Sequence, residues 1–252
     1  MESNFISIKV LRSRAKSCSK QQDLSIGNII QMVKSVPRSK LKPDDIQKIF
    51  ETFEKSDPNP KGELDYTNNF TLLVAVVLSA QATDTGVNKA TKSLFKIADS
   101  PQKMLDLGLE ALQEHIKTIG LFRTKAKNVI RLSEQLLENF SGEVPDNLKD
   151  LQSLAGVGRK TANVVLNIAF GQPTIAVDTH LFRVSNRTGM APGKNTDEVE
   201  QGLLKRVPKK YGMQAHHWLI LHGRYICKAR KPECYHCIIE QWCKFTPKNL
   251  QS

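Results

Sequence analysis

The sequence is poor in aromatic residues, in acidic residues and in long apolar runs, and each shortage excludes a class of protein. Aromatic residues make up only 6% of the 252 residues, which argues against the broad stacking platforms that hold single-stranded nucleic acid. The longest apolar run, Phe70 to Leu78, is far too short to cross a bilayer, so we expect no membrane partner. The N-terminus has no apolar segment before a small-residue cleavage site and does not resemble a secretory signal.

The deficit of acidic residues makes the chain strongly basic. Against 25 Asp and Glu stand 37 Lys and Arg, which gives a formal net charge of +12. Such a charge favours a polyanionic partner, either nucleic acid or an anionic surface, although a basic protein without such a partner remains the alternative on charge alone. Residues 1–42 are polar and basic with few acids, so we expect a flexible basic extension there. Its composition also weakly resembles an organelle transit peptide.

The chain lacks any alternating strand pattern of useful length, and its periodicity predicts an all-α protein of roughly ten helices. Residues 43–55 read as a first amphipathic helix and residues 125–140 as a long one. Residues 70–81 are apolar nearly all round, which predicts a buried central helix. We expect Asp84 and Thr196 to cap the helices that follow them.

The five cysteines are unevenly distributed, because four of them lie within seventeen positions and Cys18 stands alone. The four are Cys227, Cys234, Cys237 and Cys243. Without a secretion signal this spacing favours a metal site over disulfides. Zinc and an iron–sulfur cluster both remain open, because the spacing matches neither two Cys-x2-Cys pairs nor the common ferredoxin patterns. The loop between the first two cysteines carries three cations that we expect to contact phosphate: Lys228, Arg230 and Lys231.

The segment 154–166 reads as the turn and second helix of a helix–turn–helix pair, with Gly156 and Gly158 in the turn. Glycine at both positions allows positive φ and lets a ligand approach the bare backbone. The N–H groups that open the second helix, with the helix dipole behind them, suit a phosphate. The segment is not a P-loop, because the Gly-x4-Gly-Lys spacing and a leading strand are missing.

Two residues near this turn carry candidate chemistry. Lys160 lies at the start of the second helix, and a basic neighbourhood with partial burial would lower its pKa and expose the amine lone pair. Such an amine can attack C1′ of a deoxyribonucleotide, expel the base and leave an imine. Asp178 follows an extended β-branched run at an N-cap position and could stabilise charge on the sugar or deprotonate the lysine. The alternatives are a phosphate-contacting Lys160 and an Asp178 that only caps its helix.

Four segments together resemble the endonuclease III family, DNA glycosylases of the helix–hairpin–helix superfamily. They are 78–84, 154–165, 176–180 and 222–243, and the resemblance extends over about residues 43 to 247. It implies base excision repair: removal of oxidised pyrimidines from duplex DNA, followed by cleavage 3′ to the abasic sugar. Lys160 would be the Schiff-base nucleophile and Asp178 its catalytic carboxylate. The related adenine glycosylases lack a lysine at this position, so Lys160 favours the bifunctional glycosylase and lyase.

The resemblance also implies an organisation into two helical domains with the DNA in the cleft between them. Residues 62–172 would form a helical-barrel domain with the hairpin. Residues 43–61 together with 173–252 would form the second domain, in which the four cysteines hold a [4Fe–4S] cluster.

The same resemblance implies residues that hold the opened duplex. Gln81 would fill the gap left by a flipped nucleotide, and Leu121 would wedge into the opposite strand. Gly156, Gly158 and Arg159 would contact DNA at the hairpin. We expect a monomer in a bacterial cytoplasm, nucleoid-associated when on DNA. A non-catalytic helix–hairpin–helix DNA-binding protein is the alternative function.

Overall fold

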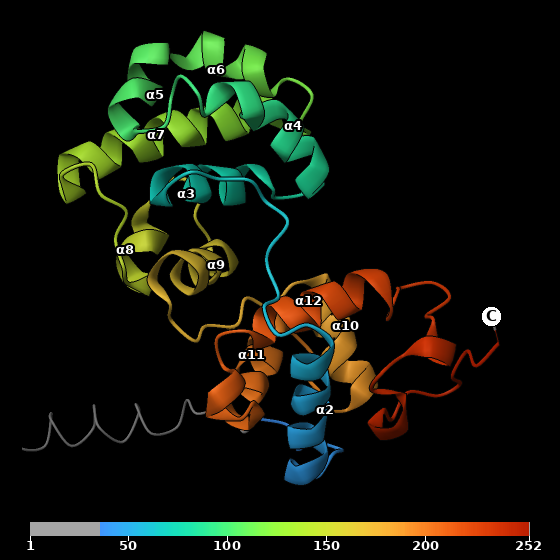
Figure 1. Ribbon diagram of the computed structural model, residues 1–252. Coiled ribbons are helices and arrows are strands. Elements are labelled where there is room, and N and C mark those ends of the chain that lie inside the picture. The colour runs from blue at the N-terminus through green and yellow to red at the C-terminus, as the bar shows by residue number, and fades with distance from the viewer. Residues whose placement is uncertain (1–35, 252) are drawn as a thin grey trace, which may run out of the picture. The chain divides into compact units, whose positions relative to one another are not determined.

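A computed structural model describes residues 36–251, and in this part of the chain it contains helices and loops but no strand (Figure 1). This confirms the all-α prediction. None of the helices in this part is long and apolar enough to cross a membrane. The α-helices are α2 (Pro43–Ser56), α3 (Asn69–Leu78), α4 (Asp84–Leu94), α5 (Pro101–Leu107), α6 (Leu109–Ile116), α7 (Phe122–Phe140), α8 (Leu148–Ser153), α9 (Arg159–Phe170), α10 (Thr179–Thr188), α11 (Thr196–Arg206) and α12 (Ala215–Tyr225). Three short 3-10 helices are η1 (Lys209–Tyr211), η2 (Cys234–His236) and η3 (Glu240–Trp242).

The first hydrophobic core forms around α3, which is buried along its whole apolar length from Phe70 to Leu78. The helices α4 to α9 contribute the rest of this core, and α3 packs directly against α7 and α9. The prediction of a buried central helix is confirmed, but the helix ends at Leu78 rather than at Gln81. The backbone leaves the helical path at Gln81, which adopts a left-handed φ of 55°, and the hydroxyl of Ser79 donates to the carbonyl of Val76 at 2.9 Å in the last turn.

The second hydrophobic core is built by α2, α10, α11 and α12 and is rich in aromatic rings. The ring of Phe50 stacks on Tyr211 with centroids 5.7 Å apart, and Phe53 stacks on Trp218 at 6.3 Å. Gly223 lets α12 approach α10 closely, because a Cβ at this position would lie 2.8 Å from the Cβ of His180. The predicted helix at 43–55 is therefore present, and it packs against segments far from it in the sequence.

Two predicted helix caps are wrong by one residue. Thr83, not Asp84, caps α4, and its hydroxyl accepts from the amide of Gly86 at 3.2 Å. Asn195, not Thr196, caps α11 by accepting from the amide of Glu198 at 2.9 Å. In both cases two adjacent residues can cap a helix, and the sequence alone does not choose between them.

The packed part of the chain begins earlier than the predicted extension 1–42 allows. The backbone amide of Lys40 donates to the carbonyl of Gly189 at 2.8 Å, and the hydroxyl of Ser39 donates to the same carbonyl at 3.1 Å. Leu41 is buried in the second core. Residues 37–42 therefore belong to the folded body, and the remainder of the predicted extension, with Cys18, lies outside the described residues.

Candidate active site

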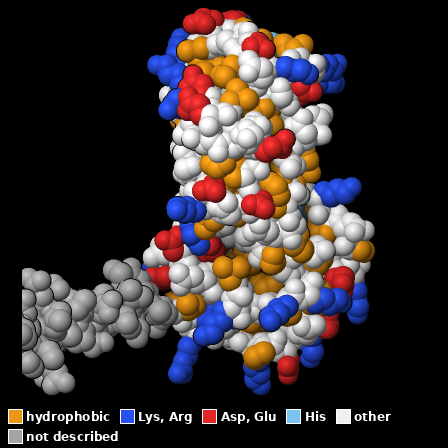
Figure 2. All heavy atoms as spheres, turned by 90° about the vertical axis from the view of Figure 1, so that its left-hand side faces the viewer, with side chains coloured by type: hydrophobic (Ala, Val, Ile, Leu, Met, Phe, Trp, Pro, Cys, Tyr) orange, Lys and Arg blue, Asp and Glu red, His pale blue; other side chains and the backbone are white. Residues whose placement is uncertain are grey.

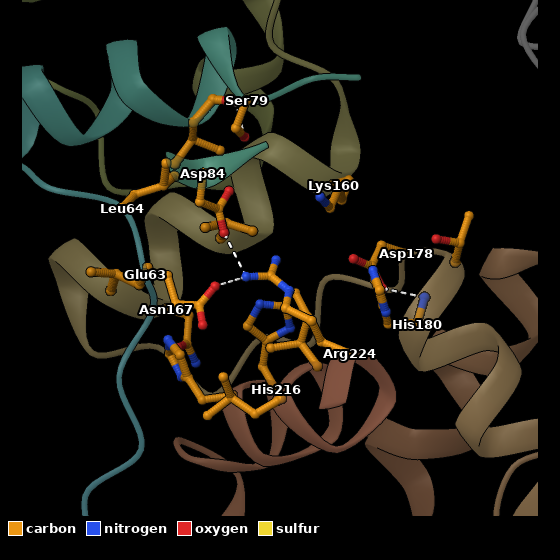
Figure 3. A pocket seen from close by; sticks show the side chains of 18 of the residues that line it. Glu63, Leu64, Ser79, Asp84, Lys160, Asn167, Asp178, His180, His216 and Arg224 are labelled. Atoms are coloured by element: carbon orange, nitrogen blue, oxygen red, sulfur yellow. Dashed lines mark hydrogen bonds and ion pairs between the residues drawn. The ribbon is translucent and has the colours of Figure 1, made fainter. Parts of the chain in front are cut away.

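A pocket of about 1300 Å³ lies where α9 of the first core meets α10 and α12 of the second. Lys160 and Asp178, predicted from the sequence as nucleophile and carboxylate, both line it (Figure 3). Gln81 lines it too. The pocket therefore brings together an amine, a carboxylate and a polar side chain that come from three separate segments of the chain.

The hairpin that carries Lys160 is formed by α8, a short turn and α9. Gly156 adopts a φ of +76°, and a Cβ there would lie 2.9 Å from the side chain of Asn128 on α7, so both its conformation and its surroundings require glycine. Gly158 has a φ of −86°, so the positive φ that glycine allows is used at Gly156 and not at Gly158. A Cβ on Gly158 would meet nothing within 4 Å. The fold therefore needs glycine at Gly156, while Gly158 leaves open space in front of the N-terminus of α9.

Lys160 and Asp178 make different contacts within the pocket. Lys160 is exposed in the first turn of α9, and among residues 36–251 no carboxylate oxygen lies within 4 Å of its amine. One carboxylate oxygen of Asp178 accepts from the amides of His180 at 2.8 Å and Leu181 at 3.0 Å, which confirms the predicted N-cap of α10. Its second oxygen accepts no hydrogen bond from the described residues. Asp178 can therefore cap α10 with one carboxylate oxygen and still offer the other oxygen to a ligand in the pocket.

An ion-pair network forms part of the wall of the pocket that also contains Lys160 and Asp178. This network was not predicted from the sequence. The guanidinium of Arg224 on α12 donates to Asp84 at 2.8 Å and also to Glu63, which accepts from the hydroxyl of Tyr225 as well (Figure 3). Burial raises the pKa of the Asp84 carboxyl, an effect that the charge of Lys160 opposes. The network ties α12 of the second core to the segment before α3 and to α4.

His216 lies in the wall of the pocket with only 4% of its surface exposed. Burial lowers the pKa of this imidazole to about 3, and the positive charges of His217 and Lys160 act in the same direction. Its buried Nδ1 has no hydrogen-bond partner among the described residues. The imidazole is therefore neutral at physiological pH. The adjacent pair of histidines was the only signal in the sequence that could have pointed to it.

Gln81 and Leu121, the predicted duplex-opening residues, lie in neighbouring loops. A Cβ on Gly120 would lie 4.0 Å from the carbonyl oxygen of Gln81. Both Gln81 and Leu121 adopt left-handed φ values, of 55° and 60°, and both side chains are exposed. Left-handed non-glycine residues cost about 1 kcal/mol or more and concentrate at functional sites. The observed strain at two neighbouring exposed residues supports a functional role for this edge.

Lys125 braces these two loops and was missed by the sequence analysis. Its amine donates to the carbonyl of Leu78 at 3.0 Å, and its backbone amide donates to the carbonyl of Leu121 at 3.1 Å. The side chain is buried, and this burial lowers the pKa of its amine. A charged residue four positions before Val129, on the apolar face of α7, is the signal that could have found it.

Arg159, expected on DNA, forms a bidentate ion pair with Glu200 on α11. Its Nε and Nη2 donate to the two carboxylate oxygens at 3.1 Å and 2.6 Å. The Glu200 side chain is 8% exposed and the Arg159 side chain 46%. A DNA contact by the exposed part of Arg159 stays a prediction, but the pair itself joins the two cores.

The four cysteines of the C-terminal segment line one small apolar pocket, to which the side chains of Ile226 and Phe245 also contribute. Within the described residues, no three His, Cys, Asp or Glu side chains lie together as ligands of a single metal ion. Arg187 on α10 reaches the sulfur of Cys227 at 3.6 Å. Burial raises the pKa of the Cys237 thiol to about 11, and the neighbouring thiols add to the rise. Such a thiol becomes a thiolate at neutral pH only against a strongly positive partner.

The three predicted cations of the cysteine loop are all exposed, and one of them already has a partner. Lys228 forms an ion pair with Glu233, whereas Arg230 and Lys231 form none within the described residues. Arg187 holds the backbone of this loop in place, because its guanidinium donates to the carbonyls of Lys228 at 2.7 Å and Ala229 at 3.0 Å. The face drawn in Figure 2, seen from the left of Figure 1, carries Lys and Arg side chains near its upper end and over its lower part, which is the side of the second core.

Known proteins resemble this chain over most of its length. Residues 74–209 match the HhH-GPD superfamily of base excision DNA repair proteins. Endonuclease III of Haemophilus influenzae is 58% identical over 200 residues, which are 79% of this chain and 95% of that protein. Endonuclease III of Rickettsia conorii is 60% identical with the same coverage of both chains.

A solved structure gives the same result at the level of the fold. The structure of a trapped endonuclease III–DNA covalent intermediate superposes with a TM-score of 0.76 at 44% identity, covering 81% of this chain and 96% of that one. A non-covalent endonuclease III–DNA complex matches with the same values. With the pocket, the hairpin and the four cysteines in place, the chain belongs to the endonuclease III family within the HhH-GPD superfamily of base excision DNA repair proteins.

Proposed function

We propose that this protein is a bifunctional base excision repair enzyme. It removes oxidised pyrimidines from duplex DNA and then cleaves the strand 3′ to the abasic sugar. The observation that carries this proposal is the meeting of Lys160 and Asp178 in one pocket. The family supports it as well, since a relative at 44% identity has been captured as a covalent DNA intermediate.

Lys160 is the nucleophile in this proposal. Its amine nitrogen bonds to C1′ of the flipped nucleotide while the glycosidic bond breaks, and the base leaves with a proton. Opening of the sugar ring gives an imine between the lysine and C1′. The imine acidifies the C2′ protons, and loss of one expels the 3′ phosphate by β-elimination. The exposed amine, which no described carboxylate holds, is free to reach the sugar.

Asp178 acts on the other side of C1′. A carboxylate at this point stabilises the positive charge that builds on the sugar as the base departs, and it can take a proton from the lysine. One oxygen of Asp178 is fixed by two backbone amides of α10, which orients the second oxygen. The capping hydrogen bonds and the catalytic role therefore use different oxygens.

The hairpin and the duplex-opening edge hold the DNA. The open space in front of Gly158 and the N-terminus of α9 suits a phosphate. Gln81 enters the gap left by the flipped nucleotide, and Leu121, which is 63% exposed, inserts from the neighbouring loop. Gly156, Arg159 and the loop cations Lys228, Arg230 and Lys231 add further contacts; Gly156 does so through the turn that it shapes.

We infer that the two hydrophobic cores correspond to two domains, 62–172 and 43–61 with 173–252. Apart from Ala176, the buried residues of the first core lie within 62–172, and apart from Leu41 those of the second lie within 43–61 and 173–252, which supports this division. The four cysteines fit a [4Fe–4S] cluster better than a single zinc ion, because they surround one apolar pocket without meeting at a single point. When bound, the cluster supplies a rigid cross-link of the C-terminal segment rather than a reacting centre. The loop between Cys227 and Cys234 would then present its cations at a fixed place.

The partner of this protein is duplex DNA that contains damaged bases or abasic sites. We further infer a monomer that acts on the nucleoid of a bacterial cytoplasm. The bacterial origin of the endonuclease III relatives supports this location.

A non-catalytic DNA-binding protein is the alternative, and borohydride trapping separates the two. The substrate is a duplex with one oxidised pyrimidine, and the variants are the wild type and Lys160→Gln. The wild type should give a covalent protein–DNA adduct and a nicked strand, whereas the variant should give neither. Affinity for a duplex with an uncleavable abasic analogue should stay within a few-fold.

Three outcomes would contradict the proposal. Equal loss of adduct and of DNA affinity in Lys160→Gln would make Lys160 a phosphate contact. Intact DNA binding by a wild type that neither forms an adduct nor releases base would leave a binding module. Release of free base without an adduct would instead indicate a hydrolytic glycosylase.

A further inference from the structure

The Arg159–Glu200 ion pair joins the two halves of the active site at a place that the proposed chemistry does not use. Arg159 is the first residue of α9, and Lys160 follows it directly. Glu200 lies on α11, which packs against α10, and Asp178 caps α10. One bidentate contact therefore connects α9, which carries the nucleophile, to α11, which packs against the helix capped by the carboxylate. Figure 1 labels these three helices, α9, α10 and α11.

The burial of Glu200 shows that this contact is more than a surface ion pair. Its side chain is 8% exposed, and among the described residues only Arg159 donates hydrogen bonds to its carboxylate. A buried carboxylate without a partner is strongly destabilising, whereas two parallel charge-assisted hydrogen bonds satisfy it in a fixed geometry. The planar guanidinium can meet both oxygens in only one orientation. The pair therefore defines where the first turn of α9 lies against α11.

We propose that Glu200 is a positioning residue that holds Lys160 at its working distance and angle from Asp178. The proposal rests on the proposed function, because it assigns these two residues the roles given there. Displacing a reacting group by about 1 Å can cost roughly a hundredfold in rate. Glu200 acts through Arg159 and touches neither DNA nor the reacting atoms.

The ion pair also changes the expected role of Arg159. A guanidinium that binds phosphate as its main task would gain freedom when Glu200 loses its charge, and DNA affinity would stay or rise. A guanidinium that positions α9 would leave DNA affinity nearly unchanged, but the chemical step would slow. Glu200→Gln therefore separates the two roles, since it keeps the shape of the side chain and removes the charge.

The experiment compares the wild type, Glu200→Gln, Glu200→Asp and Glu134→Gln. The last is a matched control, because Glu134 pairs with Arg131 on the same helix α7, within one core. The single-turnover rate of base release is measured with enzyme in excess, and Kd is measured on a duplex with a tetrahydrofuran abasic analogue. We expect a loss of rate on the order of tenfold to a hundredfold in Glu200→Gln. Its Kd should change less than threefold, Glu200→Asp should recover part of the rate, and Glu134→Gln should match the wild type.

Hydrogen–deuterium exchange gives a readout that does not depend on activity. The amides of residues 162–164, the first that bond within the helix α9, should exchange faster in Glu200→Gln and at the wild-type rate in Glu134→Gln. If the wild type released no base, the proposed function would fail, and the exchange data would still decide whether the pair fixes α9. A wild-type rate in Glu200→Gln, a Kd that rises as much as the rate falls, or unchanged exchange would each overturn the proposal.

Should Glu200→Gln fold poorly, the double variant Arg159→Gln/Glu200→Gln serves in its place. It leaves no buried charge and keeps one amide–amide hydrogen bond. The same loss of rate is expected, because the two residues act as one unit. A double variant with wild-type rate would refute the positioning role. A decrease of about one in the slope of log affinity against log salt, caused by losing Arg159, would indicate a phosphate contact instead.

Discussion

The two hydrophobic cores are held together in different ways. The first core is mostly aliphatic and is organised around a helix that is buried along its full apolar length. The second core is aromatic around Phe50, Tyr211 and Trp218, and it continues into a C-terminal segment with little burial of its own. Between Cys227 and Gln251, Ile239 is the one residue that is fully buried.

Burial can therefore account for the order of the first core but not for the order of the segment that ends the second. Fixing one residue costs about 1–2 kcal/mol of backbone entropy, and a segment of this length with one fully buried side chain cannot offset that cost by burial alone. Hydrogen bonds from Arg187 hold part of residues 227–251, and we infer that the four thiols around one pocket, when they bind a metal, provide the larger attraction. Changes to backbone conformation or packing should therefore destabilise the first core. Loss of a bound metal should instead disorder residues 227–251 at the end of the second core.

Loss of one cysteine should have the largest effect. In Cys237→Ala the segment 227–251 should lose its order while α3 stays protected, because metal binding at structural thiolate sites contributes about 10 kcal/mol or more to folding. Hydrogen–deuterium exchange and limited proteolysis would follow the two regions separately, with iron content measured alongside. Tyr235→Phe, in the same loop, is the control. A segment that stays protected without iron would show that packing alone orders it.

The two hairpin glycines should respond in opposite ways, at a smaller scale. Gly156→Ala should lower the free energy of unfolding by about 2 kcal/mol, because alanine at this positive φ is strained and its Cβ meets Asn128. Gly158→Ala should change stability by less than about 0.5 kcal/mol. It should weaken binding of an abasic-analogue duplex, by about tenfold, because its Cβ enters the space that we assign to phosphate.

Urea unfolding and fluorescence anisotropy measure the two effects on the same preparations. Each glycine serves as the control for the other, since the two are separated by one residue. If both variants lost stability equally, Gly158 would be a structural glycine and the phosphate assignment would lose its support. If Gly156→Ala kept full stability, the first core would tolerate a strained backbone at this position, and the predicted loss in the free energy of unfolding would be wrong.

The sequence predicted what depends on local pattern. The buried helix at α3, the hairpin with Gly156, the N-cap role of Asp178 and the grouping of four cysteines follow from periodicity, turn chemistry and spacing. The family resemblance placed Lys160 and Asp178 in one site before any coordinates did.

What the sequence could not predict depends on contacts between distant segments. Asp84 was expected to cap a helix, yet its carboxylate pairs with Arg224, which is 140 positions away. Arg159 was assigned to DNA because nothing local points to Glu200 on another helix. Lys125 interrupts an apolar face, but only the folded chain shows that the carbonyl of Leu78 is its acceptor. Such pairings are set by packing, and no local pattern encodes them.

Acid should distinguish the cores through His216, with an effect on stability similar in size to that of Gly156→Ala. This histidine of the second core stays neutral when folded, because burial lowers its pKa to about 3, against 6.5 as the ordinary value. Below pH 6.5 the unfolded chain binds a proton that the folded chain does not. The contribution of His216 is therefore fully present above pH 6.5 and declines as pH falls toward 3. By pH 5 the loss should reach roughly 2 kcal/mol.

The measurement is the free energy of unfolding in urea at pH 7 and pH 5 for the wild type, His216→Gln and His115→Gln. His115, a partly buried histidine on α6 of the first core, is the control replacement. In His216→Gln the decrease between the two pH values should shrink by roughly 2 kcal/mol. Hydrogen exchange at pH 5 should show the weakening in α12 before α3. An unchanged pH dependence in His216→Gln would mean that water or a rotated side chain solvates this imidazole. The second core would then owe its acid sensitivity to other groups.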